Sequence, residues 1–445
     1  MENSNKYCSE HLPGISMETA LLASRRMSKL KIFSDQNYYA MHADVAFAKM
    51  DPSFHATIFG SLEGRTLFKH EQIARTLGIL SKLDDKALEQ PELHLEQDQL
   101  TEYFQDFKNK YPCVDIFISS LGNIFMHELA LDLSKDFHRA GISTEIKNEN
   151  CDINSRSKIS IFVAPHEFFT LGKGSQWMTD DIIKNAFVWN TEQMQTPWFA
   201  RSIPAILSAK GVFDISPQAA QLFNNATIPS MHLEPGAEIN HRWLTDKDIY
   251  HPLIRVLPNA AKNPLFGISN WNERPIDISF FGSDSPRREL FFSKNAAFFA
   301  QYPSFIYYRR GRYGPIRARF DDQSLTRIAG HLSGVSKISL NVHRDEFSYF
   351  EWHRMVRQGM SSGSLVVSDH CLPHPHFKPG VHFFQDELKH LPNLIAWLLN
   401  DEEGKRKAKQ VISQASNILI SPKNSMQRTS QILKFIRKVM EESQS

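Results

Sequence analysis

The sequence lacks the features that define several large classes of protein. Its 445 residues include only four cysteines and no Cys-x-x-Cys pair, which argues against a disulfide scaffold or a thiolate zinc site and favours a reducing compartment. No run of about 18 uncharged apolar residues is present, so we expect no membrane-spanning helix. The polar start, Met1-Glu2-Asn3, lacks the apolar core of a secretory signal.

An excess of charge of one sign is also missing. The chain has 51 Lys and Arg against 49 Asp and Glu, a formal net charge of +2, so it carries no broad basic field and is not expected to bind nucleic acid. With 41% hydrophobic and 22% charged residues, the composition is that of an ordinary globular protein. The length predicts more than one domain.

Residues 1–110 are predicted to form a mainly helical N-terminal extension. Apolar residues recur at three- and four-residue spacings over 17–30 and 71–83, which predicts helices there. The aromatic segment 38–59 between them shows no such period and is expected to be irregular. The extension could recognise an acceptor, form a dimer or extend the first lobe.

From residue 114 onward, short apolar runs alternate with helical patterns such as 125–139, 350–360, 388–399 and 404–440. The expected strands are 114–119, 142–145, 159–164, 186–190, 211–216 and 230–233, then 277–281, 304–308, 336–341, 364–368 and 381–384. Strands that alternate with helices indicate parallel sheets. The sequence therefore predicts an α/β protein with two Rossmann-like lobes, 111–265 and 266–420, joined near 255–275 and followed by a C-terminal helix, 421–445.

Ligands of open parallel sheets bind at the carboxyl ends of the strands, so the loops there are the candidate sites. In the second lobe, Gly282 and Ser283 end a strand just before the adjacent arginines at 287 and 288, a pattern that suits a phosphate at a helix N-terminus. Arg309 and Arg310 end the next strand and could clamp a diphosphate bidentately. The alternative for both loops is a solvated turn.

The segment 336–369 holds the densest set of candidates. Its strand ends at Asn341 and is followed by a polar loop, a helical pattern, a glycine and a buried strand. Glu351 and Gln358 are seven residues apart, which would place both on one helix face, where they could accept hydrogens from sugar hydroxyls. The alternative is a solvated helix with an internal pair between Glu351 and Arg354.

Candidates in the first lobe also follow strands. His166 or Glu167 could act as a general base, because histidine suits proton transfer near neutral pH; the alternative is a structural histidine at the next helix. Asn123, Glu192 and Gln193 could line the same edge. No metal site is predicted, since the histidines at 374 and 376 lie in a proline-stiffened loop without a carboxylate motif.

The segment 336–369 resembles the signature of group-1-type glycosyltransferases with the GT-B fold, closest to the spore-maturation-protein-like branch. The matching residues are Asn341, Glu351, Arg354, Gln358, Gly363, Val366 and Val367. The runs 280–288, 190–193, 214–216 and 233–236 also resemble that branch, and the resemblance spans 114–420. It departs from the family at Phe350 and Gln358, which stand where the broader family has two glutamates.

This resemblance implies two Rossmann-like lobes that face each other across a cleft, with a UDP- or GDP-linked sugar donor on the second lobe and no cofactor or metal. It implies transfer to a glycan, lipid-linked or protein acceptor on the side of Asn123, Glu192 and Gln193. The catalytic candidates are His166, Glu167 and Glu351; the donor-binding candidates are Gly282, Ser283, Arg287, Arg309, Arg310, Asn341, His343, Arg354, Gln358 and Gly363.

Two other functions remain open on the sequence. A non-catalytic nucleotide- or glycan-binding protein with a degenerate GT-B fold is supported by Gln358, which can hydrogen-bond a ribose but cannot carry charge. The other is a different nucleotide-sugar enzyme of the same fold, such as an epimerase. The expected location is the cytoplasm, and weak contact of the basic run 405–409 with the inner face of a membrane stays open.

Overall fold

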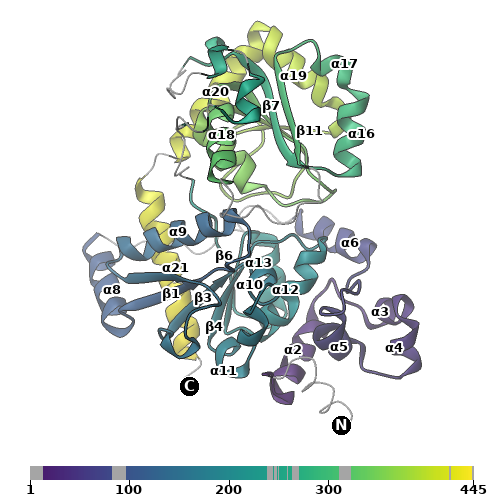
Figure 1. Ribbon diagram of the computed structural model, residues 1–445, viewed down its shortest axis with the longest axis vertical. Coiled ribbons are helices and arrows are strands. Elements are labelled where there is room, and N and C mark those ends of the chain that lie inside the picture. Colours follow the sequence, from purple (N-terminus) through teal and green to yellow (C-terminus); the bar gives the residue numbers. More distant parts are fainter. Residues whose placement is uncertain are drawn as a thin grey trace. The chain divides into compact units, whose positions relative to one another are not determined.

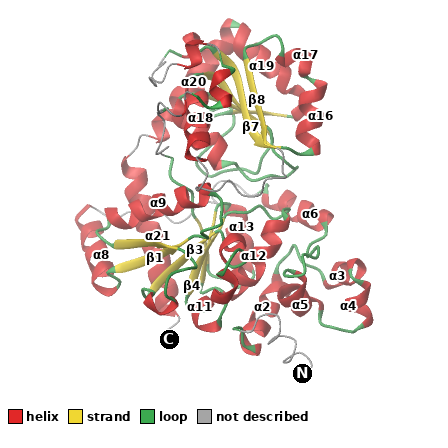
Figure 2. Cartoon of the chain, viewed as in Figure 1, coloured by secondary structure: helices red, strands yellow, loops and turns green. Residues whose placement is uncertain are grey.

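We describe a computed structural model of the chain (Figure 1). The structure describes residues 14–82, 97–237, 244, 248, 250–257, 259–262, 270–309, 322–419 and 422–442. The chain divides into two compact units, Met1–Pro235 with Pro422–Ser445, and Gly236–Ser421. Each unit contains one sheet surrounded by helices (Figure 2). The predicted domain boundaries and the predicted cleft between the lobes stay predictions.

The first unit begins with short helices rather than with an irregular segment. Its helices are α2 Met17–Lys29, α3 Asp35–Met41, α4 Ala43–Phe47, α5 Pro52–His55, the π-helix η1 Ala56–Gly60, α6 His70–Leu80 and α8 Gln97–Lys110. The prediction of helices at 17–30 and 71–83 is confirmed by α2 and α6. The prediction that 38–59 is irregular was wrong, because α3, α4 and α5 are too short to show a period, although Ser34 and Asp51 cap two of them.

The N-terminal helices pack against the sheet-bearing part of the same unit. Helix α2 lies against α12 (Pro197–Ser208), where Arg26 Nη1 donates to Leu207 O at 2.7 Å and so satisfies a carbonyl at the helix end. Ser16 N donates to Asp180 Oδ1 at 2.9 Å. These helices are therefore part of the first compact unit.

The first sheet has six parallel strands in the order β2-β1-β3-β4-β5-β6. They are β1 Cys113–Phe117, β2 Ser143–Lys147, β3 Ile159–Val163, β4 Ala186–Asn190, β5 Gly211–Asp214 and β6 Ser230–His232. The helices between them are α9 Ile124–Arg139, α10 Pro165–Phe168, α11 Asp180–Ile183, α12 and α13 Pro217–Asn225. Every strand predicted for the first lobe is present.

The second sheet has five parallel strands in the order β11-β10-β9-β7-β8. They are β7 Ile276–Ser283, β8 Ser304–Arg309, β9 Ser336–Asn341, β10 Leu365–Asp369 and β11 Phe384–Asp386. Its helices are α15 Pro252–Arg255, α16 Pro286–Lys294, α17 Ala296–Phe299, α18 Asp322–Gly334, α19 Leu391–Asn400 and α20 Glu402–Leu419. The predicted strand 381–384 begins later, at Phe384.

The helix predicted over 350–360 differs from the expectation. The chain forms a π-helix, η7 (His353–Gly359), followed by the 3-10 turn η8 (Met360–Ser362). Glu351 precedes η7, and a π-helix does not keep the 3.6-residue period. The argument that Glu351 and Gln358 share one helix face was therefore wrong.

The helical pattern 404–440 forms two helices that belong to different units. Helix α20 lies in the second unit, whereas α21 (Pro422–Glu442) returns to the first. Ile432, Leu433 and Ile436 on α21 are buried in the core of the first sheet. Within the described part of the chain, no helix is both long enough and apolar enough to cross a membrane.

Candidate active site at the carboxyl ends of the strands

The strand orders single out one position in each sheet. In both, the order reverses once, between β1 and β3 in the first sheet and between β7 and β9 in the second. Ligands of such sheets bind outside the carboxyl ends of the strands at this switch point. The loops that follow these four strands carry most of the residues that the sequence predicts to be functional.

Gly282 and Arg354 meet at the carboxyl end of β7. A Cβ at Gly282 would lie 2.6 Å from Phe280 Cζ and 3.0 Å from Arg354 Nη1, so only glycine leaves room for this guanidinium. Arg354 Nη1 also donates to Phe281 O at 3.3 Å. The cation of Arg354 is thereby held against the backbone at the strand end.

Glu351 forms an ion pair with Arg354, the internal pair that the sequence left as an alternative. Burial opposes ionisation of Glu351, but the positive charge of Arg354 outweighs it and lowers the pKa of the carboxyl. An ionised, paired carboxylate is a poor proton acceptor, so Glu351 is suited to holding Arg354 in place.

We expect Glu351→Ala to lower the free energy of unfolding by about 3 kcal/mol, because it leaves a largely buried cation without its carboxylate. Glu403→Ala on α20 is the matched control, since its pair with Arg406 is exposed and should contribute nothing measurable. Urea unfolding of both variants is the measurement. Equal losses would contradict the buried character of the pair.

Arg288 is a buried arginine that the sequence offered together with Arg287 for a phosphate, although the donor-binding candidates include only Arg287. Its Nε donates to Val342 O and its Nη1 to Ser283 O, both at 2.8 Å. Its Nη2 is buried and has no hydrogen-bond partner among the described residues. Burial, followed by the charge of Arg354, lowers the pKa of Arg288 to about 9. A cation in this situation would be stabilised by a bound anion.

A sequence signal for Arg288 exists in the helix that carries it. Helix α16 buries Arg288, Phe291 and Phe292, which are spaced at three and four residues. Because an amphipathic helix buries one face, this spacing places Arg288 with the two aromatic residues and leaves Arg287 outside the apolar row. The helical periodicity of the sequence could therefore have identified Arg288 as the arginine on the buried face of α16.

His343, Asp369 and Arg287 form a second polar group at the ends of β9 and β10. Asp369 Oδ1 accepts the backbone N–H of His343 at 2.9 Å and lies 2.7 Å from its Nδ1, while Oδ2 lies 2.5 Å from Arg287 Nη1. Burial opposes ionisation of Asp369, but His343 and Arg287 outweigh it and lower its pKa to about 2. Arg287 is therefore committed to a carboxylate of the protein.

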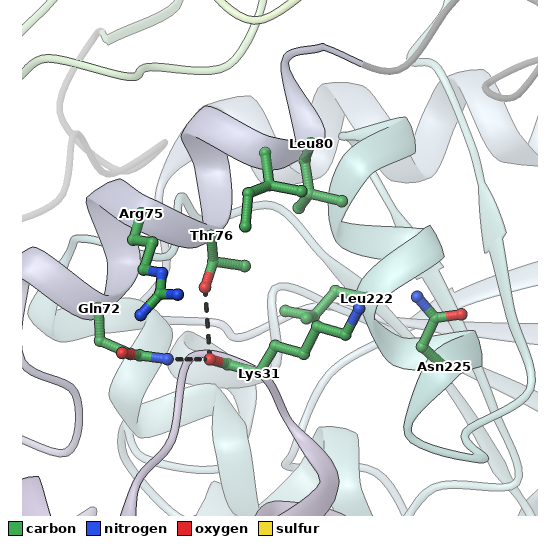
Figure 3. Close-up of a pocket in the computed structure, with 8 residues that line it drawn as sticks. Lys31, Gln72, Arg75, Thr76, Leu80, Leu222 and Asn225 are labelled. Carbon is green, nitrogen blue, oxygen red and sulfur yellow. Dashed lines mark hydrogen bonds between the residues drawn. The ribbon is translucent and has the colours of Figure 1, made fainter.

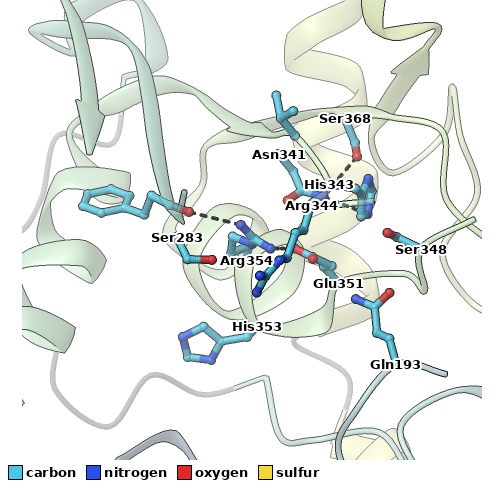
Figure 4. Close-up of polar contacts among 12 residues, drawn as sticks. Gln193, Ser283, Asn341, His343, Arg344, Ser348, Glu351, His353, Arg354 and Ser368 are labelled. Atoms are coloured by element: carbon cyan, nitrogen blue, oxygen red, sulfur yellow. Dashed lines mark hydrogen bonds and ion pairs between the residues drawn. The ribbon is translucent and has the colours of Figure 1, made fainter. Parts of the chain in front are cut away.

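Asn341 joins this group through its amide. Its Nδ2 donates to Ser368 Oγ at 3.1 Å and lies 3.2 Å from His343 Nε2 (Figure 4). An ionised Asp369 can only accept, so Nδ1 of the imidazole carries a hydrogen. Asn341 Oδ1 is buried and has no partner among the described residues, so one acceptor remains for a ligand.

The remaining donor-side candidates lie elsewhere. Gly363 has φ +69° and lies beside Arg274, whose Nη1 donates to Ser336 O at 2.9 Å, at the amino end of β9. Asp369 stands at the other end of β10, roughly 13 Å along the strand at about 3.3 Å per residue. The left-handed backbone at this turn accounts for Gly363 without a ligand.

Gln358 and Arg309 are described, whereas Arg310 lies outside the described residues. Gln358 is buried, with its Nε2 3.3 Å from His353 Nε2. Arg309 ends β8 opposite Ser283, and its carbonyl accepts the N–H of Asp284 at 2.9 Å. Arg309 thus lies one strand away from the Gly282 loop.

The switch point of the first sheet is occupied by Glu167 and Asn123. Glu167 Oε2 accepts the backbone N–H of Asn123 at 2.9 Å, and a Cβ at Gly122 would lie 2.4 Å from this oxygen. Burial raises the pKa of Glu167 to about 7, although the N–H of Asn123 acts in the opposite direction. This carboxyl group changes its charge near neutral pH, as a general base must. Asn123 also caps α9 through its side chain.

His166 lies next to Glu167 and close to Glu192. Its Nε2 is 3.5 Å from Glu192 Oε1 and 3.9 Å from Glu167 Oε1. Burial, together with the positive charge of Arg201, lowers the pKa of His166 to about 3, so the imidazole is neutral near pH 7. Ala164, two residues earlier, has φ +53°, a strained conformation that turns the chain from β3 into α10.

Glu192 and Gln193 follow β4 in a turn braced by hydrogen bonds. Asn190 Nδ2 donates to Glu192 O at 3.0 Å, Thr196 Oγ1 lies 3.2 Å from Glu192 Oε2, and Gln195 Nε2 donates to Gln193 Oε1 at 2.9 Å. The fold thus brings together four of the predicted site residues in the first unit: Asn123, His166, Glu167 and Glu192.

Three other features take no part in these clusters. A cavity of about 310 Å³ lies at the last turn of α13; it is lined by Lys31, Gln72, Arg75, Thr76, Ile79, Leu80, Leu222 and Asn225, none of which belongs to the clusters above (Figure 3). In the loop that carries the histidines at 374 and 376, His374 is buried, and its Nδ1 accepts the N–H groups of His376 and Phe377 at 3.2 and 3.3 Å. The basic run on α20 pairs internally, as Lys405 with Glu402 at 2.7 Å.

No family model and no curated protein sequence matches the chain significantly. Among solved structures, it is similar to Anabaena HepE in complex with UDP and glucose, with 12% identity over 75% of this chain and 100% of that chain, and a TM-score of 0.42. An α-glucosyltransferase in complex with UDP and a 13-mer DNA shows 10% identity over 68% and 94%, with a TM-score of 0.38. TarM shows 12% identity over 62% and 54%, with a TM-score of 0.33.

These similarities concern the α/β fold alone. At such scores they carry no argument about activity, and none of them concerns the spore-maturation-protein-like branch, which stays a prediction. The proposal for the function therefore rests on the two strand-end clusters.

Proposed function

We propose that the chain is a glycosyltransferase that uses a nucleotide-sugar donor. The observation that carries this proposal is Arg288, whose buried Nη2 lacks a partner among the described residues at the switch point of the second sheet. Arg354 lies against Gly282 at the same strand end. Two cations at one strand end suit a diphosphate, which would accept charge-assisted hydrogen bonds from both.

The donor would bind with its diphosphate near Arg288 and Arg354. Asn341 Oδ1, the unused acceptor, would take a hydroxyl hydrogen of the ribose or the sugar. When the bond between the anomeric carbon and the diphosphate breaks, negative charge moves onto the leaving diphosphate, and the arginines stabilise it. Because side chains supply this charge, we propose that the reaction needs no metal ion. The base, UDP or GDP, stays open.

The first unit would present the acceptor at its own switch point. An acceptor hydroxyl would attack the anomeric carbon and give its proton to Glu167, whose pKa of about 7 suits this transfer. Neutral His166 and the carboxylate of Glu192 would hydrogen-bond other hydroxyls. A glycan, lipid-linked or protein acceptor would each offer the required hydroxyl. The described cysteines, at 113, 151 and 371, are free thiols, which supports a cytoplasmic location.

Nucleotide release from UDP- and GDP-sugars tests the proposal. We expect one nucleotide class to raise Tm and its sugar conjugate to release nucleotide at a rate that increases as pH rises through about 7, because Glu167 must lose its proton to act as a base. Glu167→Gln should lower the rate by about 100-fold or more and remove this pH dependence, with the Tm shift by nucleotide unchanged. Glu145→Gln on β2, an exposed glutamate, is the control.

Three outcomes would count against this assignment. Donor binding without turnover in the wild-type protein, unaffected by Glu167→Gln, would favour the non-catalytic binding protein. A nucleotide-sugar converted into another nucleotide-sugar without any acceptor would favour an epimerase. Absence of both binding and turnover with every donor would remove the proposal.

A further inference from the structure

An exposed tryptophan lies next to the His166 cluster. Thr196 caps α12, which places Trp198 in its first turn, and 43% of this side chain is exposed. The centre of its ring lies 6.2 Å from that of His166. His166 Nε2 in turn lies within 4 Å of carboxylate oxygens of Glu192 and Glu167. An apolar ring surface therefore adjoins the proposed base.

Arg201, one turn further along α12, stacks on this tryptophan. Its Cζ lies 4.7 Å from the centre of the Trp198 ring, a cation–π geometry. Arg201 is exposed and forms no ion pair or hydrogen bond among the described residues, whereas Arg139, Arg156 and Arg437 in the same unit each pair with an acid. The stack holds the guanidinium plane in one orientation and leaves its N–H groups available to an oxyanion.

We infer that Trp198 and Arg201 form a subsite for an acidic sugar, a pyranose ring that carries a carboxylate or a phosphate. The exposed part of the indole would contact the apolar face of the ring, and the guanidinium would bind the anionic group bidentately. Hydroxyl groups of the same ring would then point toward Glu192, His166 and Glu167. The assignment of this subsite to the acceptor rests on the proposed function.

The charges around the subsite favour this choice over a neutral sugar. Carboxyl oxygens of Glu192 and Glu167 lie within 4 Å of His166 Nε2 and would repel an anion, whereas Arg201, stacked on Trp198, would attract the acidic group. An anion placed there orients the ring with its hydroxyls toward the carboxylates, which accept hydrogen bonds. The positions of the two charge types thus define one orientation of the bound sugar.

Saturation-transfer NMR titrations of the full chain with glucuronate, glucose 6-phosphate and glucose, at matched ionic strength, test this inference. We expect at least one acidic sugar to bind with a Kd at least tenfold lower than glucose. Arg201→Gln should abolish that preference, and Trp198→Ala should weaken all three sugars. Arg25→Gln on α2 is the matched control, because Arg25 is exposed but remote in sequence and stacks on no aromatic ring in the part of the chain that the structure describes.

The three titrations also identify the anionic group. A preference for glucuronate indicates a carboxylate, and a preference for glucose 6-phosphate indicates a phosphate. Equal affinities for acidic and neutral sugars, or a preference that survives Arg201→Gln, would overturn the inference. Inorganic phosphate that binds as tightly as glucose 6-phosphate would overturn the contribution of the ring. Calorimetric titration with UDP and GDP is independent of the sugar titrations. If the wild-type protein bound neither nucleotide but kept the preference for an acidic sugar, only the proposed function would be refuted.

Discussion

Arg288→Met is expected to weaken nucleotide binding by about 10- to 100-fold, which corresponds to the loss of a charge-assisted hydrogen bond of about 1.5–3 kcal/mol. Methionine keeps much of the length of the side chain over the Phe280 ring, 5.6 Å from the arginine, but offers no N–H group. Arg288→Lys keeps a charge and loses the fork that reaches Val342 and Ser283, so an intermediate affinity is expected. Calorimetric titration with UDP and GDP is the measurement.

The stability of these variants separates a binding role from a structural one. Arg288→Met also leaves the carbonyls of Val342 and Ser283 without their donor, so a loss of about 1–3 kcal/mol in the free energy of unfolding is expected. Arg406→Met on α20, where the arginine is exposed, should change neither quantity. If Arg288→Met lost stability but bound nucleotide like the wild-type protein, or if Arg288→Lys stayed folded with unchanged affinity, the donor would bind elsewhere.

Deletion of residues 422–445 is expected to unfold the first unit, although these residues follow the second unit in the chain. Helix α21 buries Ile432, Leu433, Ile436 and Val439 in the core of the first sheet. Four such side chains contribute about 6–12 kcal/mol at about 1.5–3 kcal/mol each, which is comparable to the whole stability of a domain. Arg428 and Thr429 also bind the buried Asp136 on α9.

Thermal unfolding and limited proteolysis check this prediction. The truncated chain should lose the transition of the first unit and become sensitive to protease there, while the second unit, which contains none of α21, stays folded. Leu433→Ala provides a graded test, with an expected loss of about 2–5 kcal/mol. Leu290→Ala is its control, because Leu290 is 55% exposed and Leu433 is fully buried. A truncated chain with an unchanged first transition would show that α21 is dispensable.

The strands and their parallel pairing could be predicted because the signal is local. All five residues of β3 and all five of β4 are buried, which gives the continuous apolar runs typical of strands covered on both faces. The same local signal was absent from 38–59, where short capped helices left no period to detect. It was misleading at 350–360, since a π-helix departs from the spacing on which the prediction relied.

The candidate site could be predicted in outline, because functional loops of parallel sheets follow the strand ends. Gly282, Asn341, His166 and Glu167 were found by this rule. It did not predict that Gly363 lies at the amino end of its sheet, or that Arg287 pairs with Asp369 while Arg288 Nη2 has no hydrogen-bond partner among the described residues. Strand direction alone does not determine which charges meet.

By itself, the amino-acid sequence determined two parallel α/β sheets with polar loops at the strand ends, since hydrophobic runs and glycine-bearing turns act within a few residues. Only the tertiary structure decided which side chains become neighbours and what their charges are. Arg354 reaches the carbonyl of Phe281, 73 residues away, and Glu167 acquires its pKa from the burial that the surrounding elements impose. Hydrogen bonding and desolvation depend on distances between segments that only the folded chain brings together.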